Sequence, residues 1–273
     1  MLVATALMWG LAGVCVKSLT WGAGSIIAVK SLLSMILVAA ATRKIKFRFT
    51  KENVAVVLLM VATCSLYTIA IKLTTAGTAI ALQYINPILV LLYGIVFQKR
   101  KPRPIEIILV FAVFAGCVLA FADTLDFTHI LGNALAIVSG FCLAGEIIIM
   151  SGGKCDNESC TVWSNGLSFL IFLPLLLTDK ALTFDTKNVV WILISGLIQF
   201  GLANILYAKG IRKVDQVEAA LILTIEPVFN PIPVAIFCGE MMGPLAIAGS
   251  VIVIISIIIY TLLPRFTKHA GTV

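Results

Sequence analysis

The sequence predicts an all-α integral membrane protein whose ten transmembrane helices form two five-helix repeats of inverted topology. Three observations lead to this fold class. The chain of 273 residues is 60% hydrophobic and 12% charged, whereas soluble domains average roughly 45–50% apolar and about 25% charged residues. Apolar runs follow one another with short loops between them, and the two halves of the chain resemble each other.

Ten apolar runs predict the helices. A bilayer core about 30 Å thick is crossed by about 20 helical residues, within a range of roughly 17–25. The first run lacks the basic start of a signal peptide and leads into a second run, so we take it as the first span. In chain order the predicted spans are residues 2–19, 25–41, 53–71, 78–97, 104–122, 130–150, 161–177, 189–208, 217–237 and 244–263.

The basic residues predict the orientation, because Lys and Arg in short loops are retained on the cytoplasmic side. With the N-terminus inside, the outer loops hold Lys72, Lys180 and Lys187. The inner segments hold fifteen: Arg43, Lys44, Lys46, Arg48, Lys51, Lys99, Arg100, Lys101, Arg103, Lys154, Lys209, Arg212, Lys213, Arg265 and Lys268. We predict a multi-pass protein of the plasma (inner) membrane with both termini cytoplasmic. Topology explains the net charge of +7, and without an extended basic face no nucleic-acid partner is expected.

The second half of the chain repeats the first. An offset of 140 residues pairs Tyr67 with Tyr207, Lys72 with Arg212, Ala79 with Ala219, Ile85 with Ile225, Pro87 with Pro227, Phe97 with Phe237 and Pro104 with Pro244. In the first span of each half, an offset of 130 pairs Ala4, Ala6 and Gly10 with Ala134, Ala136 and Gly140. The predicted repeats are residues 1–125 and 126–273. Because each holds five helices, the second enters the membrane from the opposite side.

The loop charges agree with this inversion. Lys99, Arg100 and Lys101 make the loop after the fourth span basic, whereas its counterpart, Gly239-Glu240-Met241-Met242, has no Lys or Arg. The first loop is therefore expected inside and the second outside.

Several short motifs carry a family resemblance: Leu7-Met8-Trp9-Gly10 in the first span, Lys30 in the second, Asn86-Pro87 in the fourth, and Glu226-Pro227 and Phe237-Cys238-Gly239-Glu240 in the ninth. In order and spacing they resemble the EamA-type drug/metabolite transporters, whose two five-helix copies cover nearly the whole chain. One departure is that Gln98-Lys99-Arg100 stands where the family usually has an acidic Gly-Glu ending. The resemblance implies a secondary-active transporter of amino acids or related metabolites, often an exporter, working by alternating access.

The sister families suggest an alternative substrate class. They carry nucleotide sugars or phosphorylated sugars, and such anions require several Lys or Arg side chains in the cavity. The predicted cavity offers Lys30. We therefore rank an exchanger of nucleotide sugars or sugar phosphates second to a carrier of amine-containing metabolites.

Two prolines mark the expected substrate region. Pro87 and Pro227 lie about halfway along the fourth and ninth spans, and each lacks the N–H that would bind the carbonyl four residues earlier. The carbonyls of Gln83 and Leu223 are thereby freed. Interrupted helices near the bilayer midplane commonly build transporter binding sites, so these two breaks are expected to face a cavity.

Glu226 is the leading candidate site residue, because a carboxylate at the bilayer centre costs about 2.5–3.5 kcal/mol even on an insertion scale. It could bind an amine-bearing substrate, take up a coupling proton, or stay neutral and hydrogen-bonded to a neighbouring helix. Gln83 and Asn86 on the fourth span, and Asn230 one turn beyond Glu226, extend a polar stripe along each broken helix.

Other intramembrane polar and aromatic side chains are secondary candidates. Trp9, Tyr84, Gln199, Asn204 and Tyr207 could line the cavity, although Trp and Tyr also favour membrane interfaces, and Asn and Gln also join helices.

Three charged residues receive a structural interpretation. Lys30 is expected to extend its amine to the headgroups, with an anion-attracting role as the alternative. Glu146 and Glu218 are expected at the interfaces or in gates.

Rival classes lack their usual motifs. The sequence shows no Gly-rich phosphate loop, metalloprotease helix or flanked nucleophilic serine, so no enzyme activity and no cofactor are predicted. Cys155 and Cys160 are too few for a usual metal site. A membrane enzyme would show paired carboxylates or His clusters at one depth, and a non-transporting interaction protein would not explain both prolines.

The expected partners are a small-molecule substrate and the lipid bilayer. Proton coupling, and the choice between monomer and homodimer, stay open.

Overall fold

The computed structural model of the chain describes residues 1–43, 46–233 and 243–269, with the backbone alone for residues 124 and 263–269. Every regular element of this described part is a helix. Seven helices are long and apolar enough to cross a bilayer, and shorter apolar helices cover Leu2–Ser18 and Pro104–Ala120. The chain is therefore an all-helical membrane protein with multiple spans, as its apolar runs predict.

In chain order the helices are α1 (Leu2–Trp9), α2 (Ala12–Ser18), α3 (Ala23–Thr42), α4 (Lys51–Leu73), α5 (Ala76–Gln83), α6 (Asn86–Val96), α7 (Pro104–Ala120), η1 (Ala122–Thr124), α8 (Ile130–Ser151), α9 (Asn157–Thr178), α10 (Thr186–Leu193), the π-helical segment η2 (Ile194–Leu202), α11 (Ala203–Gly210), η3 (Ile211–Lys213), α12 (Gln216–Leu223), α13 (Ile225–Phe229) and α15 (Pro244–His269).

The predicted spans begin within four residues of these helices, whereas two of them end early: the helix of the span predicted over 189–208 continues to Lys213, and α15 continues to His269. The largest difference at a start is at α9, which begins at Asn157 where the span was predicted to begin at residue 161. The polar residues there lower the hydropathy but are satisfied inside the bundle, since Asn157 donates to the carbonyls of Met150 and Ala208. Lys44, the end of the span predicted over 217–237, the Phe237–Glu240 motif and the loop to Met242 lie outside the described residues, as do the side chains of Arg265 and Lys268.

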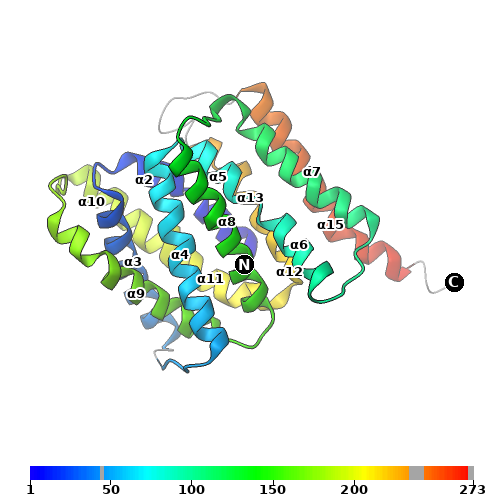
Figure 1. Ribbon diagram of the computed structural model, residues 1–273, viewed down its shortest axis with the longest axis horizontal. Coiled ribbons are helices and arrows are strands. Elements are labelled where there is room, and N and C mark those ends of the chain that lie inside the picture. The colour runs from blue at the N-terminus through cyan, green and yellow to red at the C-terminus, as the bar shows by residue number, and fades with distance from the viewer. Residues whose placement is uncertain (44–45, 234–242, 270–273) are drawn as a thin grey trace.

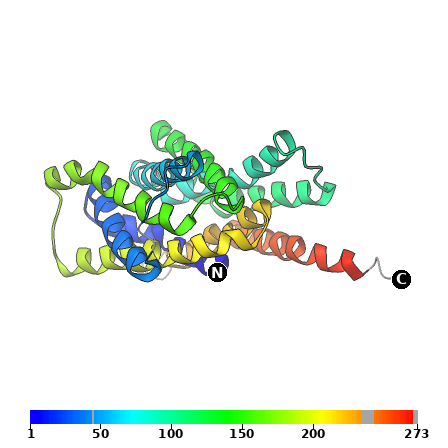
Figure 2. The same ribbon diagram turned by 90° about the horizontal axis from the view of Figure 1, so that it is seen from below.

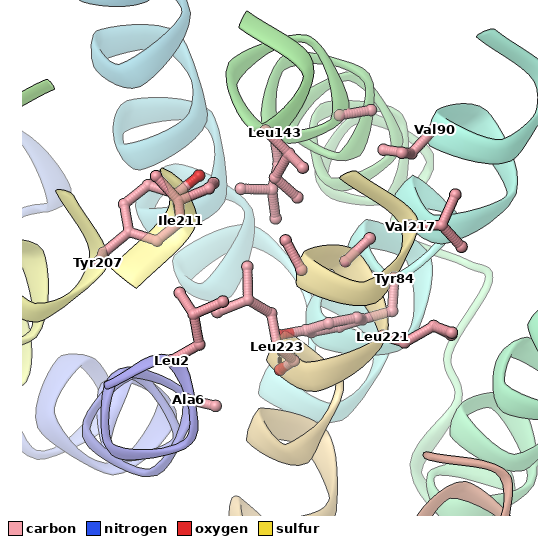
Figure 3. Packing of buried hydrophobic residues seen from close by; sticks show 14 of the residues in the cluster. Leu2, Ala6, Tyr84, Val90, Leu143, Tyr207, Ile211, Val217, Leu221 and Leu223 are labelled. Carbon is pink, nitrogen blue, oxygen red and sulfur yellow. Dashed lines mark hydrogen bonds between the residues drawn. The ribbon is translucent and has the colours of Figure 1, made fainter. Parts of the chain in front are cut away.

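The helices fall into three groups along the long axis of the molecule. At one end α7 and α15 pack side by side, at the other α3 packs against α9 and α10, and α4 packs on α8 between them (Figures 1 and 2). The largest group of buried apolar side chains extends from α1, α8 and α12 to α7 and α15, and includes Leu2, Leu143, Tyr84 and Leu223 (Figure 3). This group surrounds the interrupted helices.

Three apolar helices are interrupted in mid-course. α1 gives way to α2 at Gly10 and Leu11, α5 to α6 at Tyr84 and Ile85, and α12 to α13 at Thr224. A fourth, α10 to α11, is continuous but passes through the π-helical segment η2. Interruptions in a membrane helix release backbone groups that must find partners inside the protein, so these four places determine where polar structure can gather.

Loop hydrogen bonds join the start of α3 to the end of α9. The Asp179 carboxylate accepts from the Gly22 amide at 2.8 Å and the Ser25 hydroxyl at 2.5 Å. The indole N–H of Trp21 donates to the carbonyl of Thr183 at 2.8 Å. These bonds connect the 19–22 loop to the 179–185 loop and hold this end of the bundle together.

The contact between α7 and α15 depends on a glycine pair. A methyl group at Gly249 would lie 2.4 Å from both the Gly116 carbonyl oxygen and the Ala120 amide nitrogen. We expect Gly249→Ala to lower the free energy of unfolding by about 1–3 kcal/mol, because backbone atoms cannot move aside as flexible side chains can. Gly94→Ala is the matched control, since its nearest side-chain neighbour would be 3.8 Å away. Thermal unfolding of the two purified variants in detergent measures the difference, and equal midpoints would contradict the close packing.

The Asp179 bonds predict a pH effect on stability. Burial raises the pKa of Asp179, but the bonds from Ser25, Ala181 and Gly22 and the charge of Lys72 outweigh it, so the pKa lies below 3.8. A carboxyl with a depressed folded pKa stabilises above its unfolded pKa and loses this contribution as pH falls through the folded value. We expect Asp179→Asn to cost about 1 kcal/mol at neutral pH, after allowing for partial exposure. The gap from wild type in unfolding midpoint should narrow below about pH 4; a constant gap would argue against ionised Asp179.

Candidate functional site

One cavity lies between the first and second halves of the chain. Its lining comes from α1 to α5 and from α8, α9, η2, α11 and α13, whereas none of the described residues of α7 and α15 takes part. Its charged lining residues are Lys30, Glu146 and Glu226. Each is at most 4% exposed, so these three side chains lie away from bulk water.

The Glu226 side of the cavity is built from the breaks in two helices. Tyr84, at the end of α5, places its hydroxyl 2.7 Å from Glu226 Oε2 and 2.9 Å from the carbonyl oxygen of Leu223. The Leu223 carbonyl is the one that Pro227 leaves without its helical donor. Figure 3 shows the Tyr84 ring extending from its own helix toward Leu223. One hydroxyl therefore links the break of α12 and α13 to the break of α5 and α6.

The other freed carbonyls also find partners. The Asn86 amide donates to the carbonyl of Gln83 at 3.3 Å, and the Asn230 amide donates to the carbonyl of Gly10 at 2.9 Å. Glycines on neighbouring helices allow this close approach. A methyl group at Gly140 would lie 2.6 Å from the backbone carbonyl oxygen of Gln83, and one at Gly10 would lie 3.2 Å from the backbone carbonyl oxygen of Glu226. Asn86 and Asn230 thus serve the broken backbone around the cavity.

The π-helical segment brings further polar groups to the cavity. Gln199 and Phe200 of η2, and Asn204 just after it, line the cavity. A π-helical turn re-aims side chains relative to a regular helix and is frequent at functional sites. The period of the apolar residues in this span gives no sign of the π turn, so sequence reasoning identified the residues Gln199 and Asn204 but not their geometry.

Lys30 is placed differently from the sequence expectation. Its ammonium donates to the Thr68 hydroxyl at 2.7 Å and lies 5.0 Å from the centre of the Phe200 ring. With 4% of its surface exposed, it points into the bundle and does not extend to the headgroups. The hydroxyl and the aromatic face replace part of the lost hydration, which is why the inward position is tolerated.

Glu146 is also placed differently, because the sequence suggested an interfacial or gating residue. It is 3% exposed and lines the same cavity as Glu226. The hydroxyls of Tyr207 and Thr63 face its carboxyl. The Tyr207 ring lies 5.0 Å from the Trp9 ring. Glu146 lies about one turn from the end of α8, and the local apolar pattern does not show that other helices cover this position.

The nine predicted site residues divide into two groups. Trp9, Gln83, Gln199, Asn204 and Glu226 line the cavity. Tyr84, Asn86, Asn230 and Tyr207 are buried around it and support the broken helices or face Glu146, while Pro87 and Pro227 are buried in α6 and α13. Ser164, Asn165 and Ser168 of α9 also line the cavity; their signal was a polar stripe at helical spacing inside an apolar run.

The chemistry of the lining is that of a site for a small polar molecule. Two carboxyls, one ammonium and several amides and hydroxyls face a space with apolar walls, the usual composition of small-molecule sites. In the described part of the chain no three His, Cys, Asp or Glu residues are grouped as metal ligands. Cys155 instead bonds to Asn157, at 2.8 Å from sulfur to Oδ1.

Tyr84 should contribute measurably to stability. Tyr84→Phe removes the partner of both Leu223 and Glu226, and we expect a loss of about 1–2 kcal/mol, since bonds within membranes average about 0.6 and reach about 1.7 kcal/mol. Tyr93→Phe is the matched control, because the Tyr93 ring stacks on Phe97 and its hydroxyl has no hydrogen bond to the described residues. Unfolding in detergent measures both variants; an equal effect would contradict a supporting role for the Tyr84 hydroxyl.

Comparison with known proteins agrees with this architecture. The family model of the EamA-like transporter family matches residues 1–122 and 130–262. An uncharacterized transporter of Archaeoglobus fulgidus is 28% identical over 173 residues, 60% of this chain and 59% of that protein. The uncharacterized transporter YwfM of Bacillus subtilis is 26% identical over 178 residues, 63% of this chain and 60% of that protein. These matches span about three fifths of the relatives' lengths.

A solved crystal structure shares the fold. It superposes with a TM-score of 0.79, covering 97% of this chain and 98% of the other, at 15% sequence identity. The fold comparison concerns architecture alone, whereas the family match covers both halves of the sequence. The chain belongs to the EamA-like transporter family.

Proposed function

We propose that the chain is a secondary-active transporter that exports a small polar, amine-containing metabolite by alternating access, with ten spanning helices in two inverted repeats. The observation that carries the proposal is the cavity. It is lined from both halves of the chain, it contains two buried carboxyls and one buried ammonium, and it lies against two helix breaks. Buried charge beside broken backbone at mid-helix is the arrangement of a solute pathway.

The packing supports two related halves. In the repeat, α8 corresponds to α1, α4 to α11, and α5 and α6 to α12 and α13. The contact of α4 with α8 has its counterpart in that of α11 with α1, and the contacts of α5 and α6 with α8 have theirs in those of α12 and α13 with α1. The contacts of α3 with α9 and of α7 with α15 map onto themselves. Residues 81–90 and 221–230 alternate between buried and half-buried in the same order. The two ranges matched by the family lie on either side of the predicted boundary at 125–126.

The charge of the cavity supports an amine-containing substrate. Two carboxyls against one ammonium favour a ligand that brings a positive charge. Nucleotide sugars and sugar phosphates would bring two or more negative charges toward Glu146 and Glu226, with Lys30 as the one basic lining residue in the described part of the chain. This arrangement supports an amine-containing substrate over a nucleotide sugar or sugar phosphate.

Tyr84 gives Glu226 a means of coupling to protons. A tyrosine hydroxyl has one hydrogen, and here it faces two acceptors. If Glu226 is ionised, that hydrogen goes to the carboxylate and Leu223 loses its donor. If Glu226 is protonated, its own O–H donates to the Tyr84 oxygen, and Tyr84 donates to Leu223. Protonation of Glu226 would therefore change which backbone group at the break is satisfied.

A membrane-embedded enzyme is the second candidate. Glu146 and Glu226 line one cavity, and paired carboxylates are typical of such enzymes. Liposomes containing the purified protein separate the two: saturable counterflow of unchanged solute supports transport, and a chemically altered product supports an enzyme.

Glu226 is the residue to test first. In liposomes loaded with amino acids and small amines, we expect the wild type to show saturable counterflow that varies with pH. Glu226→Gln should reduce it by more than about tenfold, or leave a residual flux without pH dependence, because the amide cannot ionise and so cannot switch between accepting from Tyr84 and donating to it with pH. Glu52→Gln, at the start of α4 and away from the cavity, is the matched control. Wild-type counterflow at every pH in Glu226→Gln would refute the assignment.

A further inference from the structure

The two carboxyls of the cavity are not equivalent. Glu226 Oε2 is bonded to the Tyr84 hydroxyl at 2.7 Å, so part of its capacity to accept hydrogen bonds is already used. Glu146 lies on α8, and the Tyr207 and Thr63 hydroxyls that face its carboxyl do not reach the geometry of a full hydrogen bond. An ionised carboxylate can accept about four hydrogen bonds. Of the two, Glu146 has more capacity left for a ligand.

Four polar atoms in and beside the cavity are buried and make no full hydrogen bond. They are Trp9 Nε1, Thr63 Oγ1, Asn204 Nδ2 and the hydroxyl of Tyr207. Trp9, Thr63 and Asn204 line the cavity together with Glu146, and the Thr63 and Tyr207 hydroxyls face the Glu146 carboxyl. A buried polar group left unpaired costs about 1–3 kcal/mol, so four such atoms in and beside one cavity indicate a missing partner.

The kinds of atom in the cluster define that partner. The carboxylate accepts hydrogen bonds and carries negative charge, and the rings of Trp9 and Tyr207, with centres 5.0 Å apart, offer aromatic faces. An ammonium group suits both features, through a charged hydrogen bond and a cation–π contact. The indole and amide N–H groups need an acceptor, which a neighbouring hydroxyl or carboxyl oxygen of the same molecule would supply.

We propose that Glu146 binds the ammonium group of the ligand, with Trp9 and Asn204 donating to an oxygen next to it, while Glu226 stays bonded to Tyr84. This inference rests on the proposed function, since it names the residue that recognises the transported amine. It divides the work between the carboxyls: Glu146 recognises the ligand, and Glu226 carries the proton.

Ligand binding without transport tests the division. The probe is ethanolammonium chloride, which carries an ammonium and a hydroxyl two carbons apart. Unfolding midpoints of the purified protein in detergent are compared with those in potassium chloride of equal ionic strength and in ethylene glycol, which has the same size without the charge. For the wild type we expect a rise of a few degrees with ethanolammonium alone, because a ligand that binds the folded state stabilises it.

The variants decide which carboxyl binds. Glu146→Gln should abolish the rise or require more than about tenfold higher ligand concentration to reach it. Glu226→Gln should reduce the rise less than Glu146→Gln does, since it leaves the Glu146 side of the cavity intact, and Glu52→Gln, outside the cavity, should leave the rise unchanged. If Glu146→Gln is poorly folded, Trp9→Phe provides a second test: it keeps an aromatic ring but removes the indole N–H, and should weaken ethanolammonium binding more than ethylammonium binding, which lacks the acceptor oxygen.

Three results would overturn the inference: no rise in the wild type, a rise that survives in Glu146→Gln, or a rise lost in Glu226→Gln while Glu146→Gln keeps it. These results are separable from the fate of the proposed function. Counterflow of a solute together with an unchanged ethanolammonium response in Glu146→Gln would leave the transporter standing and remove Glu146 from it. A response lost in Glu146→Gln without counterflow of any solute would leave the ammonium site and remove the transport proposal.

Discussion

Every backbone group inside a bilayer must find its hydrogen-bond partner within the protein, and the structure around the cavity follows from how that requirement is met at the helix breaks. Pro227 leaves the carbonyl of Leu223 without a helical donor, and a side chain from the other half, Tyr84, supplies one at 2.9 Å. The carbonyl of Gly10 receives its donor from Asn230, again from the opposite half. Neither break is self-sufficient, so each half of the chain stabilises the irregular backbone of the other.

This mutual support needs close approach. Gly10 and Gly140 lie at matching places in the two halves, and each leaves room for a break on another helix: Gly140 for the carbonyl of Gln83, and Gly10 for the backbone of Glu226. A side chain at either glycine would push a whole helix away from a broken one, because the nearest atoms include backbone. The small residues of α1 and α8 are thus explained by the breaks they cover.

The sequence predicted the helices and the two proline-marked breaks, but not the break between α1 and α2, because only the first two have local causes. Hydrophobic length defines a span, and Pro removes a donor wherever it stands, so both could be read from neighbouring residues. Lys30 and Glu146 were misplaced because their depth depends on tertiary packing: Lys30 finds Thr68 and Phe200 on two other helices, and these partners are 38 and 170 positions away. The π-helical segment around Gln199 was not predicted for the same reason, since no single residue requires it.

The most informative difference between the halves is at the breaks themselves. The repeat pairs Glu226 with Asn86, and both stand just before a proline, yet only the glutamate can change its charge. Asn86 bonds to the carbonyl of Gln83 in its own helix and would do so at any pH. In the proposed transporter, a proton can therefore alter the α12–α13 break while the α5–α6 break stays as it is. Alternating access needs two conformations whose relative energy can be shifted. Two equivalent halves alone would not make that energy difference depend on protons. A single titratable group at one of two matched breaks supplies it.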